Sequence, residues 1–195
     1  MTALGELLKS QIAISGPVTL AEYMQTCLLH PKHGYYTSRT AIGAKGDFTT
    51  APEISQMFGE LIGLCLAQTW LNQGAPTGFA LAELGPGRGT LMQDILRATK
   101  AVPGFHAAAV VHLVEASPRL RSVQAETISD GLPVWHDNVD GLPENTPLFL
   151  VANEFFDALP IRQFQRDGKN WRERVVGVQD GSLILGLSGP APVAA

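Results

Sequence analysis

Three glycines alternate with other residues directly after an acid in the stretch Glu83-Leu-Gly85-Pro-Gly87-Arg-Gly89. Glycine lacks a Cβ and accepts a positive φ, so it suits a backbone that turns sharply against a ligand. The apolar residues 79–82 favour a strand before the turn, and the apolar spacing in residues 91–96 favours a helix after it. Free N–H groups at a helix start attract a carboxylate or phosphate. We therefore predict a strand, a tight turn and a helix that form a nucleotide-type site.

A second acid, Glu115, ends the continuous apolar run of residues 109–114. Such a run is typical of a strand buried in a parallel sheet. Ser117 and Pro118 then provide an N-cap and a first-turn proline for a helix that continues to about residue 128. The strand and helix order predicts a parallel sheet with right-handed crossovers. A carboxylate at the carboxyl end of the second strand can accept hydrogen bonds from both hydroxyls of a ribose.

Two further strands are predicted, at residues 132–135 and 147–153, and polar residues lie at the end of each. Ligands of open α/β sheets bind at the carboxyl ends of the strands, on either side of the switch point. At this edge we expect Asn153, at the end of the strand 147–153, and the segment 154–157 that follows it. The alternative is a turn with a capping Asp157 and two core aromatics. The residues that follow the shorter strand are His136, Asp137 and Asn138.

Two helices are predicted before the first sheet strand, over residues 2–14 and from a capping box at Thr19 and Glu22 to the residue before Pro31. We expect them to form a cap over the sheet. Residues 43–50 combine two glycines, Asp47, an aromatic and two hydroxyls, and loops of this composition often carry function.

A second capping box is predicted at Thr50 and Glu53, at the start of the longest helix, which would continue to Gly74 with its apolar stripe in the core. After the sheet, residues 161–165, 171–178 and 182–187 predict antiparallel strands. The tail 188–195 is expected to be disordered.

The composition excludes several classes of protein. The net charge is −4 and no basic run occurs, which disfavours a nucleic-acid partner. No apolar run reaches the ~20 residues of a membrane-spanning helix. Cys27 and Cys65 lie far apart and are expected to be buried free thiols. His30 and His33 lack an acidic or cysteine partner, so a structural role is favoured over a metal site and we predict no metal.

Three segments together resemble the MidA-like family of S-adenosylmethionine-dependent methyltransferases. They are GDFTTAPEISQMFGE at residues 46–60, ELGPGRGT at 83–90 and NEFFDALP at 153–160. The resemblance covers residues 1–178 and implies a Rossmann-type class I methyltransferase sheet with S-adenosylmethionine as cofactor. It also implies methylation of an arginine in a subunit of the respiratory NADH dehydrogenase, complex I, during assembly. Members of the family are longer, so the last strands of the family's sheet are expected beyond this chain.

With the strand ends, the resemblance leads to a hypothesis for the roles of individual residues. Glu83 would lie near the methionine ammonium, Glu115 at the ribose, and Asp137 or Asn138 beside the adenine. The full cofactor-binding set is Glu83, Gly85, Gly87, Gly89, Glu115, Asp137, Asn138 and Asn153. The catalytic candidates are Asp47, Glu154 and Asp157, with Glu53 as a further substrate-side acid and Phe156 as a wall of the methyl channel.

Alternatives remain for the function and the organisation. An NAD-dependent oxidoreductase would share the strand, the glycine turn and the distal acid. An assembly chaperone would keep the fold and the cofactor without turnover. We expect a helical cap with the loop over residues 1–50, a Rossmann-like domain over 51–187, a basic protein substrate and a homodimer as one possible assembly. The expected compartment is the bacterial cytoplasm, or the mitochondrial matrix in a eukaryote, although no transit peptide is evident at the N-terminus.

Overall fold

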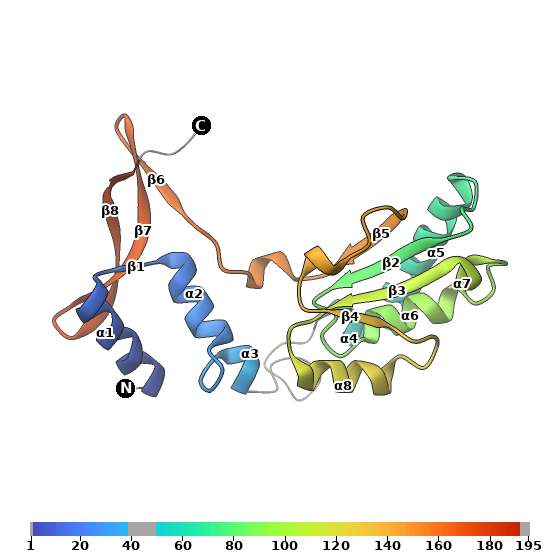
Figure 1. Ribbon diagram of the computed structural model, residues 1–195, viewed down its shortest axis with the longest axis horizontal. Helices are drawn as coiled ribbons and strands as arrows, with labels where there is room; N and C mark the ends of the chain where they lie inside the picture. The colour runs from blue at the N-terminus through green and yellow to red at the C-terminus, as the bar shows by residue number, and fades with distance from the viewer. Residues whose placement is uncertain (1, 39–49, 192–195) are drawn as a thin grey trace. The chain divides into compact units, whose positions relative to one another are not determined.

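The computed structural model describes residues 2–38 and 50–191, and the chain forms two compact units (Figure 1). One unit is residues 40–157, and the other combines residues 1–39 with 158–195. The sequence predicts a single domain over residues 51–187, and this boundary differs from the observed one. The reason is the pairing of Val18 with Val176, which joins the N-terminal segment to the C-terminal strands.

The unit of residues 40–157 is built on a parallel four-stranded sheet with the strand order β4-β3-β2-β5. The strands are β2 (Phe79–Leu84), β3 (Ala109–Val114), β4 (Val134–His136) and β5 (Leu148–Ala152). The chain moves outward from β2 through β3 to β4 and returns to the other side of β2 as β5. The topological switch point therefore lies between β2 and β5, which confirms the predicted Rossmann-type sheet.

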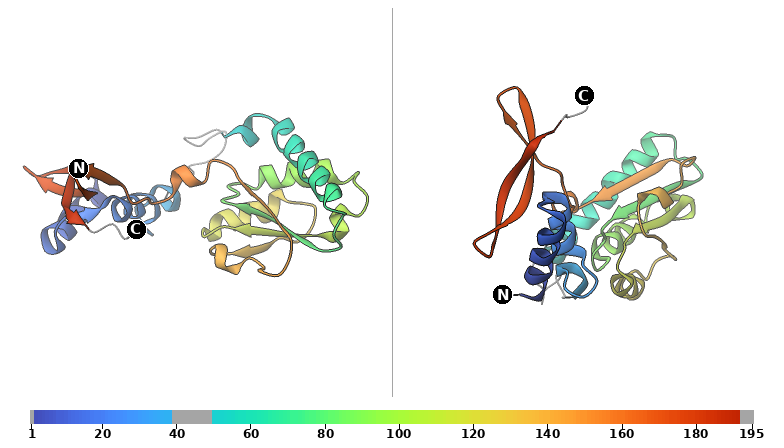
Figure 2. Two further views of the ribbon diagram at one scale, coloured as in Figure 1. Left: turned by 90° about the horizontal axis from the view of Figure 1, so that it is seen from above. Right: turned by 60° about the vertical axis from the view of Figure 1, so that its left-hand side comes forward.

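Helices accompany this sheet. They are α4 (Ala51–Ile54), α5 (Gln56–Asn72), α6 (Thr90–Thr99), α7 (Phe105–Ala108), α8 (Pro118–Thr127) and the 3₁₀ turns η1 (Val139–Gly141) and η2 (Phe156–Ala158). Helices α5 and α6 lie side by side against one face of the sheet (Figure 2). The core between them and the sheet contains four aromatic rings that contact one another, Trp70, Phe79, Phe105 and Phe149.

Helix α5 differs from its prediction in two ways. It begins at Gln56, because Ser55 is extended at φ −146° and separates it from the single turn of α4. Its buried positions include the small residues Gly59 and Gly63, and a Cβ on Gly63 would lie 3.0 Å from the Ile95 backbone. This close approach to α6 uses the small residues, so larger apolar ones such as Met57, which is 64% exposed, face away from the core. The prediction of a continuous buried stripe is therefore wrong.

In its described residues, 2–38 and 158–191, the other unit contains three helices and an antiparallel sheet. These elements are α1 (Ala3–Ser15), β1 (Val18–Thr19), α2 (Leu20–Leu29), α3 (Tyr35–Ser38), β6 (Phe164–Asp167), β7 (Asn170–Gln179) and β8 (Ser182–Ala191). Ile12, Val18 and Val176 form a small core of their own. The helices α1 and α2 thus share a core with strands rather than forming a separate helical domain.

Several local predictions in this unit are confirmed. Thr19 and Glu22 form both halves of the capping box of α2. Asp180 and Gly181 both have positive φ, 51° and 72°, as a tight hairpin between β7 and β8 requires. The pairing of these strands continues to Trp171 opposite Ala191. Residues 188–191 are therefore strand, which corrects the predicted disordered tail; residues 192–195 lie outside the described part.

The histidines and cysteines outside the sheet have simple environments. His30 Nδ1 accepts the backbone N–H groups of Lys32 and His33, each at 3.2 Å, which supports its structural role. Both cysteines are free, and Cys65 is exposed rather than buried.

Over residues 2–38 and 50–191, no helix combines the length and apolarity that a membrane crossing requires.

Candidate functional site

The glycine turn between β2 and α6 adopts the backbone conformation that its sequence predicts. Gly85, Gly87 and Gly89 have φ values of 58°, 55° and 86°, all in the left-handed region that side chains disfavour. A Cβ on Gly85 would also collide with the ring of Phe155. The Gly85 N–H donates to the Val114 carbonyl at 3.0 Å, which ties the turn to the end of β3.

A pocket lies at the switch point, under this turn. Among the described residues its lining is Thr50, Pro52, Glu53, Glu83, Gly85, Pro86, Gly87, Arg88, Thr90, Leu91, Asn153 and Glu154. The fold thus brings together residues from the end of β2, the glycine turn, α4 and the end of β5. Glu83, Glu154 and Asn153, which are far apart in the sequence, share one pocket as predicted from the strand ends.

Glu83 is the deepest acid of the pocket. Its side chain is buried, 3% exposed, and the Met92 backbone donates to it, while Oε2 has no hydrogen-bond partner in the described part of the chain. Burial raises the pKa of Glu83 to about 8. An unpartnered buried carboxylate oxygen is costly, and a cationic donor bound in the pocket would offset that cost. The site therefore fits a ligand with an ammonium group at this point.

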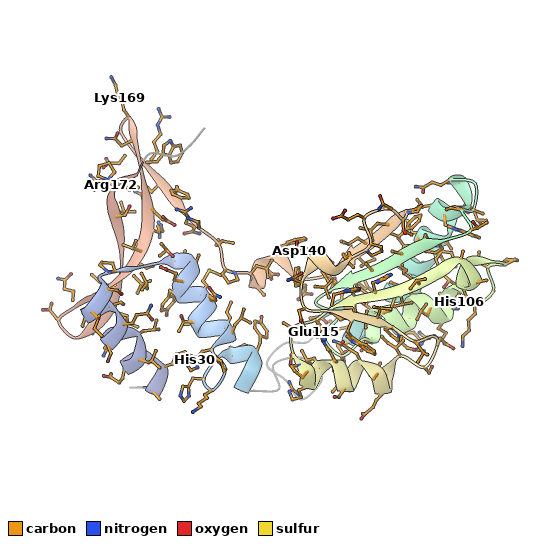
Figure 3. The ribbon with its side chains drawn as sticks, viewed as in Figure 1. His30, His106, Glu115, Asp140, Lys169 and Arg172 are labelled. Atoms are coloured by element: carbon orange, nitrogen blue, oxygen red, sulfur yellow. The ribbon has the colours of Figure 1, made fainter. Side chains whose placement is uncertain are left out.

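Glu115 lies where β3 ends and α8 approaches (Figure 3). Its Oε1 accepts the Ser117 N–H at 2.8 Å, and its Oε2 accepts from Gln124 Nε2 at 3.3 Å. Burial raises the pKa of this carboxyl, and the hydrogen bond from Ser117 opposes that rise. The Ala116 backbone also donates to this carboxylate. A carboxylate has about four lone-pair sites, so Glu115 keeps capacity for a ligand hydroxyl.

Asp137 and Asn138 follow β4 and are both exposed. Asp137 Oδ1 forms an ion pair with Arg121 Nη2 at 2.5 Å. Asn138 Oδ1 accepts the Asp140 N–H at 3.0 Å and begins η1. Neither side chain lines the pocket described above, and their role beside an adenine stays a prediction.

Of the candidates for the substrate side, some line the pocket and others do not. Glu154 lines the pocket and has a φ of 47°, a left-handed conformation that is uncommon outside glycine and is often found at functional sites. Asp157 and Phe156 are exposed in η2, and neither is among the described residues that line the pocket. Asp47 lies outside the described residues. The catalytic roles of Asp47, Glu154 and Asp157 stay predictions.

Glu53 also lines the pocket, but the predicted capping box does not form. The Thr50 side chain makes no capping hydrogen bond, and Glu53 Oε1 accepts instead from Thr90 Oγ1 at 2.6 Å. The Glu53 carboxylate is thus paired with Thr90, the first residue of α6. Glu53 therefore links two walls of the pocket.

Three residues near the site were assigned no role in it from the sequence. Phe155 packs on Gly85, Arg121 Nε donates to the Glu115 carbonyl at 2.7 Å, and Gln124 contacts both Glu115 and Gly87. Gln124 and Arg121 lie one turn apart in a polar helix, and no sequence pattern there indicates a binding site. The double aromatic at 155–156 was the one available signal, and it indicated Phe156 instead.

The sequence of residues 61–192 matches a family described as putative S-adenosyl-L-methionine-dependent methyltransferases. Curated relatives include the mitochondrial protein arginine methyltransferase NDUFAF7 of Danio rerio, 42% identical over 88% of this chain and 46% of the relative. The Homo sapiens protein of that name is 40% identical over 86% of this chain and 43% of the relative. The chain thus spans less than half the length of these relatives.

The fold is also similar to a crystal structure. A likely methyl transferase from Burkholderia thailandensis, bound to S-adenosyl-homocysteine, superposes with a TM-score of 0.80 at 30% identity. The match covers 98% of this chain and 51% of that protein. A native structure of an uncharacterised protein from the same organism gives a TM-score of 0.76 at 29% identity and covers 97% of this chain and 49% of that one.

Proposed function

Because this chain belongs to the family of putative S-adenosylmethionine-dependent methyltransferases, we propose that its pocket holds that cofactor and that the methyl group is transferred to an arginine of a protein. The observation that carries the cofactor half is Glu83, a buried carboxylate with an unpartnered oxygen beside a glycine turn. The methionine part of the cofactor carries an ammonium, which is the donor that this oxygen lacks.

The other cofactor contacts follow from the strand ends. Glu115 holds the ribose hydroxyls, and the glycine turn lies against the methionine part. Asp137 or Asn138 flanks the adenine, and Asn153 completes the site from the end of β5. When bound, the cofactor supplies an electrophilic methyl group on a sulfonium that is a good leaving group. The protein's contribution is to hold the nucleophile in line with that methyl, an effect whose ceiling is about 7–11 kcal/mol.

The arginine acceptor is supported by relatives named protein arginine methyltransferase and by the charge of the pocket. Glu53 and Glu154 both line it, and carboxylates orient a guanidinium through charge-assisted hydrogen bonds. A guanidinium is a poor nucleophile, so a carboxylate must also disperse or accept its charge. The resemblance extends the proposal to a subunit of complex I, in the bacterial cytoplasm or the mitochondrial matrix.

Glu154→Gln tests the substrate half. Transfer of labelled methyl from S-adenosylmethionine to an arginine-containing peptide is expected to fall by about 10²-fold or more, because the amide cannot accept a proton. The affinity for S-adenosylhomocysteine is expected to stay within about twofold, since the backbone and shape are kept.

Glu144→Gln is the matched control, because Glu144 is an exposed acid in a loop of the same unit and lies away from the described pocket lining. Retained turnover in Glu154→Gln would remove this residue from the chemistry. Cofactor binding by the wild-type chain without label in any peptide would instead favour an assembly factor without turnover.

A further inference from the structure

We propose that Gln124 is a positioning residue of the cofactor site, whose amide holds the glycine turn and Glu115 at a fixed separation. The inference rests on the proposed cofactor site. The Gln124 side chain is fully buried, and its Nε2 donates to the Gly87 carbonyl at 2.8 Å and to Glu115 Oε2 at 3.3 Å. One amide nitrogen thus joins the two segments that contact opposite ends of the ligand.

The orientation of this amide is determined by Trp135 on β4. Trp135 Nε1 lies 2.9 Å from the amide oxygen of Gln124. An indole N–H is a donor only, so the amide atom that faces it must be the oxygen. The NH₂ group is then directed to Gly87 and Glu115, and both of its hydrogens have an acceptor. A glutamate at this position would place a second anion against Glu115 and against a carbonyl.

The bond from Gln124 also affects the charge of Glu115. It lowers the pKa of that carboxyl, while burial raises it. Arg121 is the charged group that faces Glu115 from α8, and it is itself paired with Asp137 at the end of β4. Without the Gln124 donor, one of the interactions that lower the pKa of Glu115 is lost while burial still raises it. The Glu115 carboxylate should therefore be protonated at a higher pH than in the wild type.

Gln124→Met removes both donors and keeps the length of the side chain. Calorimetric titration with S-adenosylhomocysteine at pH 7 is expected to show about tenfold weaker binding, because a hydrogen bond to a charged group is lost. The affinity falls at low pH as Glu115 becomes protonated, and this fall is expected to begin at a higher pH in the variant. In a Glu115→Gln background the same change should cost less than about twofold, since the coupled partner is already neutral.

Gln93→Met is the matched control. Gln93 on α6 accepts the Ser129 N–H at 2.9 Å, beyond the end of α8, and among the described residues its hydrogen-bonded partners do not include Gly87 or Glu115. This variant should leave the affinity and its pH profile unchanged. The proposal would be overturned if Gln124→Met lowered the affinity by the same factor in the wild type and in Glu115→Gln, at every pH. That result would indicate a packing role for Gln124.

A measurement on the ligand-free protein separates this inference from the proposed function. The pKa of Glu115, followed by ¹³C NMR of its side-chain carboxyl, is expected to rise in Gln124→Met and to stay at the wild-type value in Gln93→Met. An unchanged pKa overturns the inference even where the wild type binds S-adenosylhomocysteine. A raised pKa with no binding by the wild type overturns the proposed function alone. If Gln124→Met does not fold, Trp135→Phe releases the amide oxygen and should raise the same pKa.

Discussion

Glu115→Gln is expected to weaken the binding of S-adenosylhomocysteine by about 10- to 100-fold at pH 7. The amide keeps the shape of the side chain and can still accept the Ser117 N–H, which lies 2.8 Å from Oε1. It loses the charge that strengthens hydrogen bonds from the ribose hydroxyls, and such bonds contribute about 1.5–3 kcal/mol. Calorimetric titration of both proteins measures the difference.

Glu126→Gln is the control for this change, because Glu126 is exposed on the same helix, α8. It makes the same chemical substitution without touching the site and should bind as the wild type does. Wild-type affinity in Glu115→Gln would show that this carboxylate does not hold the ribose.

Glu83→Gln is expected to change the pH dependence of stability. The pKa of Glu83 is about 8, against an ordinary value of 4.5, so the folded protein keeps a proton that the unfolded chain releases between these values. The wild type therefore loses stability as the pH rises from about 4.5 to 8, by at most about 5 kcal/mol. The variant cannot ionise at this position, so its free energy of unfolding should lack this decline.

Urea unfolding at pH 5, 7 and 9 tests this expectation. The stability of Glu83→Gln relative to the wild type should increase by several kcal/mol from pH 5 to pH 9, because ionisation costs only the wild type. Glu126→Gln should follow the wild type throughout. Parallel curves for Glu83→Gln and the wild type would show that Glu83 titrates near its ordinary value.

The sheet and the turn could be predicted from the sequence because their signals are local. The apolar runs gave β2, β3 and β5 nearly to the residue, and the alternating glycines at 85–89 marked a turn whose positive φ values exclude most other residues. The acids at the strand ends were found for the same reason, since strand order alone places Glu83 and Glu115 at one edge.

The contacts that complete the site could not be predicted, because they join residues far apart. Gln124 meets Gly87, and Thr90 meets Glu53, each across 37 positions of the sequence. Nothing in the local pattern distinguishes Gln124 from an exposed glutamine. The same limit applies to the exposed face of α5, since Met57 faces away only because glycines on the other side allow α6 to approach.

The domain boundary was missed for a related reason. Three antiparallel strands were correctly predicted within residues 161–187, although the first begins at Phe164 and not at Ile161. Strand propensity does not say which partner a strand takes. The partner of Val176 is Val18, near the other end of the chain. Such non-local pairing becomes visible only in the fold.

Titration of the wild-type chain with S-adenosylhomocysteine, in two buffers of different ionisation enthalpy, tests whether the pocket holds this cofactor through Glu83. We expect saturable binding at one site, with a heat that depends on the buffer. At pH 7 a carboxyl with a pKa of about 8 is about nine-tenths protonated, and pairing with the ligand ammonium should release that proton. Absence of binding to S-adenosylhomocysteine, or binding of NADH in its place, would show that the pocket is not an S-adenosylmethionine site.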